Sequence, residues 1–381
     1  MNLKKNVVWL GIISFLNDLS SEMIKPLLPL FLTALGGNGF IVGLVGGLRE
    51  SVSNFLKVLG GYWSDKLGKR KIFVVSGYSI SAFFKFLLSF SSHWVHVLGF
   101  SSLERIGKGI RTAPRDALIA ESMPKEKGKG FGIHRALDTT GAILGSVLVI
   151  LLYWQLNLSF NQIILIASLL AFISLFPFYW VKEIPSKKSF TNFKLAFQKL
   201  SFDLRMFILI STVFSLSNFT YMFFVLRAQQ FFSGKLSVLL PLLLYSIFNI
   251  FYASFSLPAG ILSDRIGRGK VIRIGYLLFS LVCLGFVFAN SFLPFLFLFA
   301  FYGIVYALVN GNQRAYVSDL SSPNLKATSL GIFHTLNGIA MLCSSLVAGI
   351  LWQTNPSLTF LYGSVLSLVS FLLFWFWDLC R

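Results

Sequence analysis

Twelve long apolar runs dominate the sequence, and they constrain the fold more than any other feature. The runs begin near residues 8, 40, 72, 95, 130, 160, 206, 238, 271, 292, 327 and 357. Each can supply the roughly 20 mostly apolar residues that an α-helix needs to cross a bilayer. Because 55% of the residues are hydrophobic and only 12% are charged, little of the chain remains for a large soluble domain. The runs therefore predict an all-α membrane protein with twelve transmembrane helices.

The positive charges predict the orientation of these helices. If both termini are cytoplasmic, the Lys and Arg residues of the loops and tails fall on the cytoplasmic side, except Lys235. This bias is typical of membrane proteins, and it explains the net charge of +19 without a nucleic-acid partner. The first run continues past Pro26 and Pro29, so we expect an uncleaved span rather than a signal peptide. We expect an integral protein of the cytoplasmic (inner) membrane.

An internal repeat divides the sequence into two halves. The segment GYWSDKLGKRK (Gly61–Lys71) recurs as GILSDRIGRGK (Gly260–Lys270), at an offset of 199 residues. Six spans in each repeat mean that both halves enter the membrane from the same side. The repeat predicts two six-helix bundles, residues 1–182 and 206–381, joined by a cytoplasmic linker at 183–205.

These motifs resemble those of the major facilitator superfamily (MFS), and the resemblance covers nearly the whole chain. The repeated segment is similar to the superfamily's loop motif after the second and eighth spans. The run from Arg105 to Gly109 resembles its RxxQG element, with Lys108 in place of Gln. The run from Gly141 to Gly145 is similar to the fifth-span glycine motif of exporters, although Ser146 stands where that motif has proline. Longer runs resemble a prokaryotic subgroup of predicted exporters that includes nickel-resistance-type proteins.

The resemblance implies the MFS fold, a 6+6 pseudo-symmetric repeat that works by alternating access. It also implies that the repeated loops act as a cytoplasmic latch, in which Asp65 is the most sensitive residue. The glycines allow tight turns, and the aspartates can accept hydrogen bonds from the N-terminal amides of a neighbouring helix. The predicted latch residues are Gly61, Asp65, Gly68, Arg70, Arg115, Asp264, Arg265 and Gly267.

Ionisable residues within the spans mark the predicted transport site, because an unpaired charge at bilayer depth is costly. They concentrate in the first half, where Asp18 and Glu22 share one helix face, whereas the second half has only Arg227 and Arg314. A buried carboxylate beside basic groups can bind and release a proton as its surroundings change. Lys85 is an exception to the pattern, and we expect it to snorkel or to pair with an acid. The predicted coupling and cavity residues are Asp18, Glu22, Arg49, Glu50, Glu104, Arg105, Lys108, Asp138, Asn218, Arg227, Asn249 and Asn310.

The sequence predicts a monomeric secondary transporter that couples export of a small organic or amphiphilic compound to protons. Efflux of a divalent metal ion of the nickel or iron type is an alternative, for which His134 and Asp138 supply only two ligands at helical spacing. Uptake of an anionic metabolite is another, given the surplus of basic residues. Enzyme motifs such as HExxH, GxSxG or a P-loop are absent from the sequence, and we expect no cofactor and no resident metal. The latch loops favour a carrier over a channel.

Overall fold

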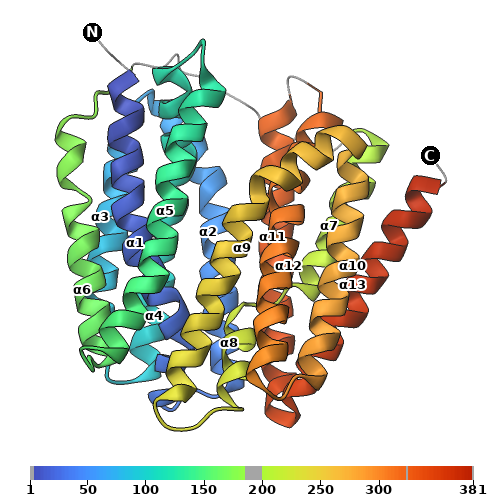
Figure 1. The fold of residues 1–381 in the computed structure, drawn as a ribbon. Coiled ribbons are helices and arrows are strands. Elements are labelled where there is room, and N and C mark those ends of the chain that lie inside the picture. Colours follow the sequence, from blue (N-terminus) through green and yellow to red (C-terminus); the bar gives the residue numbers. More distant parts are fainter. Residues whose placement is uncertain (1–3, 185–199, 323–324, 380–381) are drawn as a thin grey trace. The chain divides into compact units, whose positions relative to one another are not determined.

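The computed structural model describes residues 4–184, 200–322 and 325–379, and within these ranges the regular structure is entirely helical. Its helices are drawn in Figure 1. They are α1 (Lys4–Ala34), α2 (Gly39–Leu67), α3 (Lys71–Leu88), α4 (Trp94–Ser122), α5 (Lys127–Trp154), α6 (Phe160–Ile173), η1 (Phe176–Tyr179), α7 (Phe202–Ser217), α8 (Met222–Gln229), α9 (Leu236–Ile266), α10 (Arg268–Phe288), α11 (Phe292–Leu320), α12 (Lys326–Thr354) and α13 (Pro356–Leu379).

Ten candidate membrane spans are apolar enough and long enough to cross a bilayer within the described ranges. One of them joins α6 to η1, and another joins α7 to α8. Helices α2 and α4 are as long as the other spans, but each carries several charged side chains. With these two helices the described chain has the twelve predicted spans, and the all-α prediction is confirmed.

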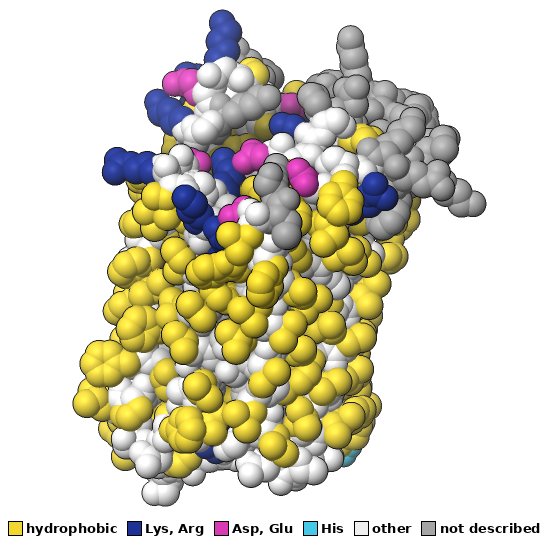
Figure 2. Space-filling view, turned by 90° about the vertical axis from the view of Figure 1, so that its right-hand side faces the viewer, with side chains coloured by type: hydrophobic (Ala, Val, Ile, Leu, Met, Phe, Trp, Pro, Cys, Tyr) yellow, Lys and Arg dark blue, Asp and Glu magenta, His cyan; other side chains and the backbone are white. Residues whose placement is uncertain are grey.

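The surface of the protein is suited to lipid. Figure 2 shows a face whose middle is covered by hydrophobic side chains, with charged side chains gathered toward one end. Large apolar side chains such as Phe288 and Leu257 are 74% and 72% exposed. Exposed apolar surface on this scale is stable in contact with acyl chains rather than water.

The seventh span is interrupted. Helix α7 ends at Ser217, and α8 begins at Met222. The intervening backbone keeps its hydrogen bonds, because the Thr220 amide donates to Ser345 Oγ at 3.1 Å and the Met222 amide donates to Thr220 Oγ1 at 3.4 Å. Such partners are what allow non-helical backbone at membrane depth.

The contacts divide the chain into two compact units. One consists of Met1–Gly36 with Leu48–Thr191, and the other of Gly37–Gly47 with Asn192–Arg381. The bundle boundaries expected from the sequence stay a prediction. Most of the expected linker, residues 185–199, lies outside the described residues.

Close packing of α1 on α5 characterises the first unit. A Cβ atom added to Gly141 would collide with the carbonyl oxygen of Phe15, and one added to Gly145 would collide with that of Leu19. The two glycines therefore let the backbones of α5 and α1 approach closely, as small residues do in membrane helix pairs.

Aromatic rings fill the interior of the second unit. Phe214 of α7 stacks on Tyr276 of α10 with centroids 4.0 Å apart, and Phe224 of α8 stacks on Tyr302 of α11 at 4.3 Å. Tyr276 and Tyr302 are almost completely buried. The aromatic contacts thus join α7, α8, α10 and α11 into one core.

Candidate functional site

Two carboxyl groups meet where α1 packs on α5. Asp18 of α1 and Asp138 of α5 lie within hydrogen-bonding reach of each other. Ser14 Oγ donates to Asp138 Oδ1 at 2.7 Å, and Arg135 Nη1 donates to Asp138 Oδ2 at 3.1 Å. On the other side, Asn17 Nδ2 donates to Asp18 Oδ1 at 3.3 Å. Two carboxyl groups at this separation share a proton readily, because both cannot stay ionised at low cost.

Basic side chains surround this acid pair. Lys108 of α4 lies within electrostatic reach of both Asp18 and Glu50 of α2, and Arg115 lies within reach of Asp138. The structure therefore brings together Asp18, Glu50, Lys108 and Asp138, which come from four different helices. Nothing in the spacing of the sequence could indicate that Asp18 and Asp138 face each other.

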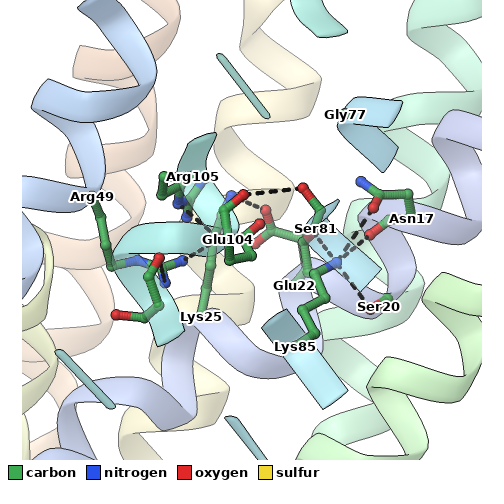
Figure 3. Close-up of polar contacts among 12 residues, drawn as sticks. Asn17, Ser20, Glu22, Lys25, Arg49, Gly77, Ser81, Lys85, Glu104 and Arg105 are labelled. Atoms are coloured by element: carbon green, nitrogen blue, oxygen red, sulfur yellow. Dashed lines mark hydrogen bonds and ion pairs between the residues drawn. The ribbon is translucent and has the colours of Figure 1, made fainter. Parts of the chain in front are cut away.

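A second cluster joins α2 to α4 around one carboxylate. Glu104 Oε2 lies 3.4 Å from Arg49 Nη2 and 3.2 Å from Arg105 Nε, and all three side chains are at most 5% exposed. Arg49 Nη1 also donates to the carbonyl oxygen of Ser101 at 3.2 Å. Figure 3 shows Arg49 and Arg105 approaching Glu104 from different sides. Two guanidinium groups thus share the charge of one acid.

On α1 itself, Lys25 and Glu22 form an ion pair one helical turn apart. The side chain of Glu22 is 6% exposed and that of Lys25 is 21% exposed. Both residues lie on the face expected from the spacing of Asp18, Glu22 and Lys25.

Lys85 of α3 differs from the expectation that it snorkels or pairs with an acid. It is 2% exposed, and its ammonium group donates to Asn17, Ser20 and Ser21 of α1. None of the ion pairs among the described residues includes Lys85. The polar residues of α1 recur at helical spacing, which is the one signal in the sequence that could have indicated these partners.

The predicted cavity residues of the second unit have varied surroundings. Asn218 and Asn310 line one narrow recess with Phe214, Phe279 and Tyr306, and Asn218 Oδ1 is buried without a hydrogen-bond partner. Asn249 is 8% exposed on α9, next to Phe248, whose ring packs on Tyr302 and Tyr306.

Arg227 has a local structural partner at the end of α10. It donates to the carbonyl oxygens of Phe286 and Val287 at 3.2 Å each, and to Ser357 Oγ at 3.4 Å. These bonds satisfy carbonyl groups that the end of α10 leaves without helical partners. Arg227 therefore caps the C-terminal end of α10.

The first predicted latch loop is an ionic network. Arg70 lies 2.6 Å from Glu121 and 3.4 Å from Asp65, while the carboxylate of Glu183 accepts the backbone amides of Arg70 and Lys71 at 2.9 Å each. Sequence reasoning missed Glu121 and Glu183. Gly68 ends α2 at a φ of 66°, a conformation that favours glycine.

Other predicted latch residues of the first unit lie around this loop. Gly61 faces Ala113 of α4, because a Cβ atom at Gly61 would lie 3.2 Å from that of Ala113. Arg115 pairs with its neighbour Asp116 at 2.9 Å.

At the same end of the first unit, Lys4 pairs with Glu126 at 2.7 Å. The hydrogen bond and charge of Lys4 hold the pKa of the exposed Glu126 carboxyl below its usual value.

The loop of the second repeat uses a different arginine. Arg268 lies 2.6 Å from Asp319 and 3.3 Å from Asp264, whereas the predicted Arg265 is exposed and forms none of the ion pairs of the described chain. Gly267 has a φ of 97° at the turn. The aspartate and the glycine of the repeat therefore occupy corresponding positions in both loops. The arginine that pairs with the aspartate differs in position, since it is Arg70 in the first loop and Arg268 in the second.

The described residues contain no group of three or more His, Cys, Asp or Glu that could hold a metal ion. His134 is 5% exposed, and its Nε2 atom has no hydrogen-bond partner.

Comparison with known proteins identifies the class to which this helical bundle belongs. The family model of the Major Facilitator Superfamily matches residues 10–243 and 235–379. The chain belongs to this superfamily. It is therefore an integral membrane protein and a secondary transporter of small molecules rather than an enzyme.

Individual relatives agree with this assignment. An uncharacterized MFS-type transporter of Methanocaldococcus jannaschii is 56% identical over 378 residues, which cover 98% of this chain and 95% of the relative. The multidrug resistance protein MdtH of Aeromonas hydrophila subsp. hydrophila is 27% identical over 162 residues, 42% of this chain and 40% of that protein. A crystal structure of a mutant of the nucleoside transporter NupG has a TM-score of 0.83 and 19% identity, over 98% of this chain and 99% of that chain, and shows the shared fold.

Proposed function

We propose that this protein is a proton-coupled exporter of a small organic or amphiphilic compound, and that Asp18 and Asp138 carry the coupling proton. The single observation behind the proposal is the contact between the two carboxyl groups. A protonated pair has one negative charge fewer than an ionised pair. Proton binding and the binding of a cationic substrate group therefore compete at the same place, which is the requirement for antiport.

The direction of transport rests on the relatives. The match to a multidrug resistance protein and the glycine motif of α5 favour export. The aromatic interior of the second unit would suit a substrate with apolar or aromatic parts.

An anionic substrate is a second candidate, and one observation favours it. Arg49 and Arg105 bring two buried guanidinium groups together at Glu104, and guanidinium groups are well suited to bind a carboxylate or phosphate. Efflux of a divalent metal receives less support, since no set of three ligands exists among the described residues.

The location in the cell is also part of the proposal. We propose that the protein is a monomer in the cytoplasmic membrane. Both termini are proposed to lie in the cytoplasm, because the basic loops follow the positive-inside rule. Reporter fusions at the two termini, active only in the cytoplasm, test this orientation.

Flux measurements with purified protein test the function itself. A thermal-shift screen with ethidium, uridine and fluorescein selects a cationic, a nucleoside or an anionic probe, because ligand binding raises apparent stability. Proteoliposomes containing a pH-sensitive dye then report whether flux of the selected probe moves protons. We expect Asp18→Asn and Asp138→Asn to abolish proton-driven flux but to retain exchange of probe for probe.

Asp203→Asn is the control, because Asp203 lies in the first turn of α7 in the second unit. This variant should keep proton-driven flux. Proton-driven flux at the wild-type rate in the Asp18 and Asp138 variants would refute the coupling site.

A further inference from the structure

Lys85 is a buried cation that the proposed mechanism does not use. Its ammonium group lies among four oxygen atoms of α1: Asn17 O and Oδ1, each at 3.4 Å, Ser20 Oγ at 3.1 Å and Ser21 Oγ at 2.8 Å. Figure 3 shows the side chain of Lys85 pointing toward Asn17 and Ser20. All four acceptors are neutral, so they solvate the charge without cancelling it.

A charge solvated in this way acts on its surroundings. An ammonium group inside a membrane bundle is costly, and buried ionisable residues of this kind usually have a functional role. Because the medium is poorly polarisable, the field of Lys85 also reaches farther than it would in water.

Asn17 connects Lys85 to the acid pair. The amide oxygen of Asn17 accepts from Lys85, while its amide nitrogen donates to Asp18 Oδ1 at 3.3 Å. Asp18 in turn contacts Asp138. One amide therefore lies between the Lys85 ammonium group and the carboxyl group that is proposed to bind the proton.

Other charged groups face the same two sites. Around Lys85, α1 contributes Asp18, and α4 contributes Glu104, Arg105 and Arg111, whereas α6 has no charged residue between Phe160 and Ile173. Around the acid pair, α1 contributes Lys25, α4 contributes Lys108, Arg111 and Arg115, and α5 contributes His134 and Arg135.

Glu104 of α4 also attracts the charge of Lys85. Glu104 is already engaged by Arg49 and Arg105. Lys85 also donates a hydrogen bond to Asn17, which in turn donates one to Asp18.

From this arrangement we infer that Lys85 is a positioning residue for proton coupling: through Asn17 it orients Asp18 and favours the ionised form of the acid pair. It thereby sets the pH at which the Asp18–Asp138 pair gives up its proton. The inference rests on the proposed function, since it assigns a role at the same coupling site.

Infrared difference spectroscopy of the purified protein tests the inference without a substrate. The carboxylic-acid C=O band is titrated with pH, and its loss in Asp18→Asn or Asp138→Asn assigns it to the pair. Removal of the positive charge in Lys85→Met should favour the protonated pair, which carries one negative charge fewer than the ionised pair. We expect the midpoint of the band to move to higher pH by about one unit, a tenfold change in proton affinity.

Two further variants separate electrostatics from packing. Asn17→Ala removes the amide between the charge and Asp18, and should raise the midpoint by a smaller amount. Ser21→Ala removes one neutral acceptor of Lys85 but leaves the charge in place, so it should lower thermal stability without moving the midpoint. Lys5→Met is the control for loss of a lysine, because Lys5 is exposed in the first turn of α1. It should leave the midpoint unchanged.

The outcomes distinguish this inference from the function on which it rests. An unshifted or lowered midpoint in folded Lys85→Met overturns the role of Lys85 and leaves the coupling site intact. Absence of any band that depends on Asp18 or Asp138 overturns both. Should Lys85→Met fail to fold, Lys85→Gln, which keeps a polar group among the oxygens, and Asn17→Ala provide the same measurement.

Discussion

Single buried charges in the first unit are stable because each has a defined set of partners. The carboxylate of Glu104 partly neutralises the charges of Arg49 and Arg105. The ammonium group of Lys85 is solvated by hydroxyl and amide oxygens. The sequence placed these residues within apolar runs. It could not indicate their partners, since Lys85 and Asn17 are 68 positions apart and meet only when α1 and α3 are assembled.

The Arg49–Glu104–Arg105 cluster yields a prediction at this scale. Glu104→Gln removes the negative charge that lies between the buried guanidinium groups of Arg49 and Arg105, so we expect a loss of about 3 kcal/mol in stability. Thermal unfolding of the purified protein measures it. Asp116→Asn is the control, because the Asp116 side chain is 44% exposed in its pair with Arg115 and should matter little. Equal unfolding temperatures for the two variants would contradict the assigned role of Glu104.

At the scale of helices, the length and hydrophobicity of the apolar runs predicted the spans well, but not the interruption between α7 and α8. The segment from Ser217 to Met222 contains neither Gly nor Pro, the usual signals of a break. The break is stabilised by Ser345 of α12, which accepts the free Thr220 amide. A partner on a helix more than a hundred positions away leaves no local pattern in the sequence.

The contact of α5 with α1 can be tested through its glycines. Gly141→Leu should push the two helices apart, with a cost of about 1–3 kcal/mol or more, and should separate Asp138 from Asp18. We therefore expect lower thermal stability and loss of proton-driven flux. Gly132→Leu on the same helix is the control, because a Cβ atom there meets nothing within 4 Å. A Gly141→Leu variant with normal flux would show that the close approach is not needed for coupling.

At the scale of the whole molecule, the sequence repeat predicted two equivalent loops, and the structure shows how they have diverged. The offset that pairs Gly61 with Gly260 pairs Arg70 with Gly269, so the second loop lacks the arginine that binds Asp65. Arg268 contacts Asp264 and Asp319 instead. The side chain of Arg70 is 10% exposed and that of Arg268 is 28% exposed, so the first network is better shielded from water.

This difference predicts unequal effects of matched variants. If the loop is a latch that stabilises one state of the transport cycle, Asp65→Asn should leave folded protein whose initial transport rate is reduced by about tenfold or more. Asp264→Asn should have a smaller effect, since the ion pairs of the second loop are more exposed and screened. Initial rates in proteoliposomes, normalised to the amount of folded protein, provide the comparison. Equal losses in the two variants would mean that the loops contribute alike.

The sequence by itself determined that this chain is a twelve-span membrane protein built from two related halves. Hydrophobic length, the distribution of basic residues and the repeated loop are local properties, and the cost of burying charge or unpaired backbone in lipid leaves few other folds. Only the tertiary structure decided that Asp18 faces Asp138, that Lys85 is solvated by α1 and that α7 breaks beside Ser345. Those contacts join segments far apart in the chain, and they depend on how closely the helices pack.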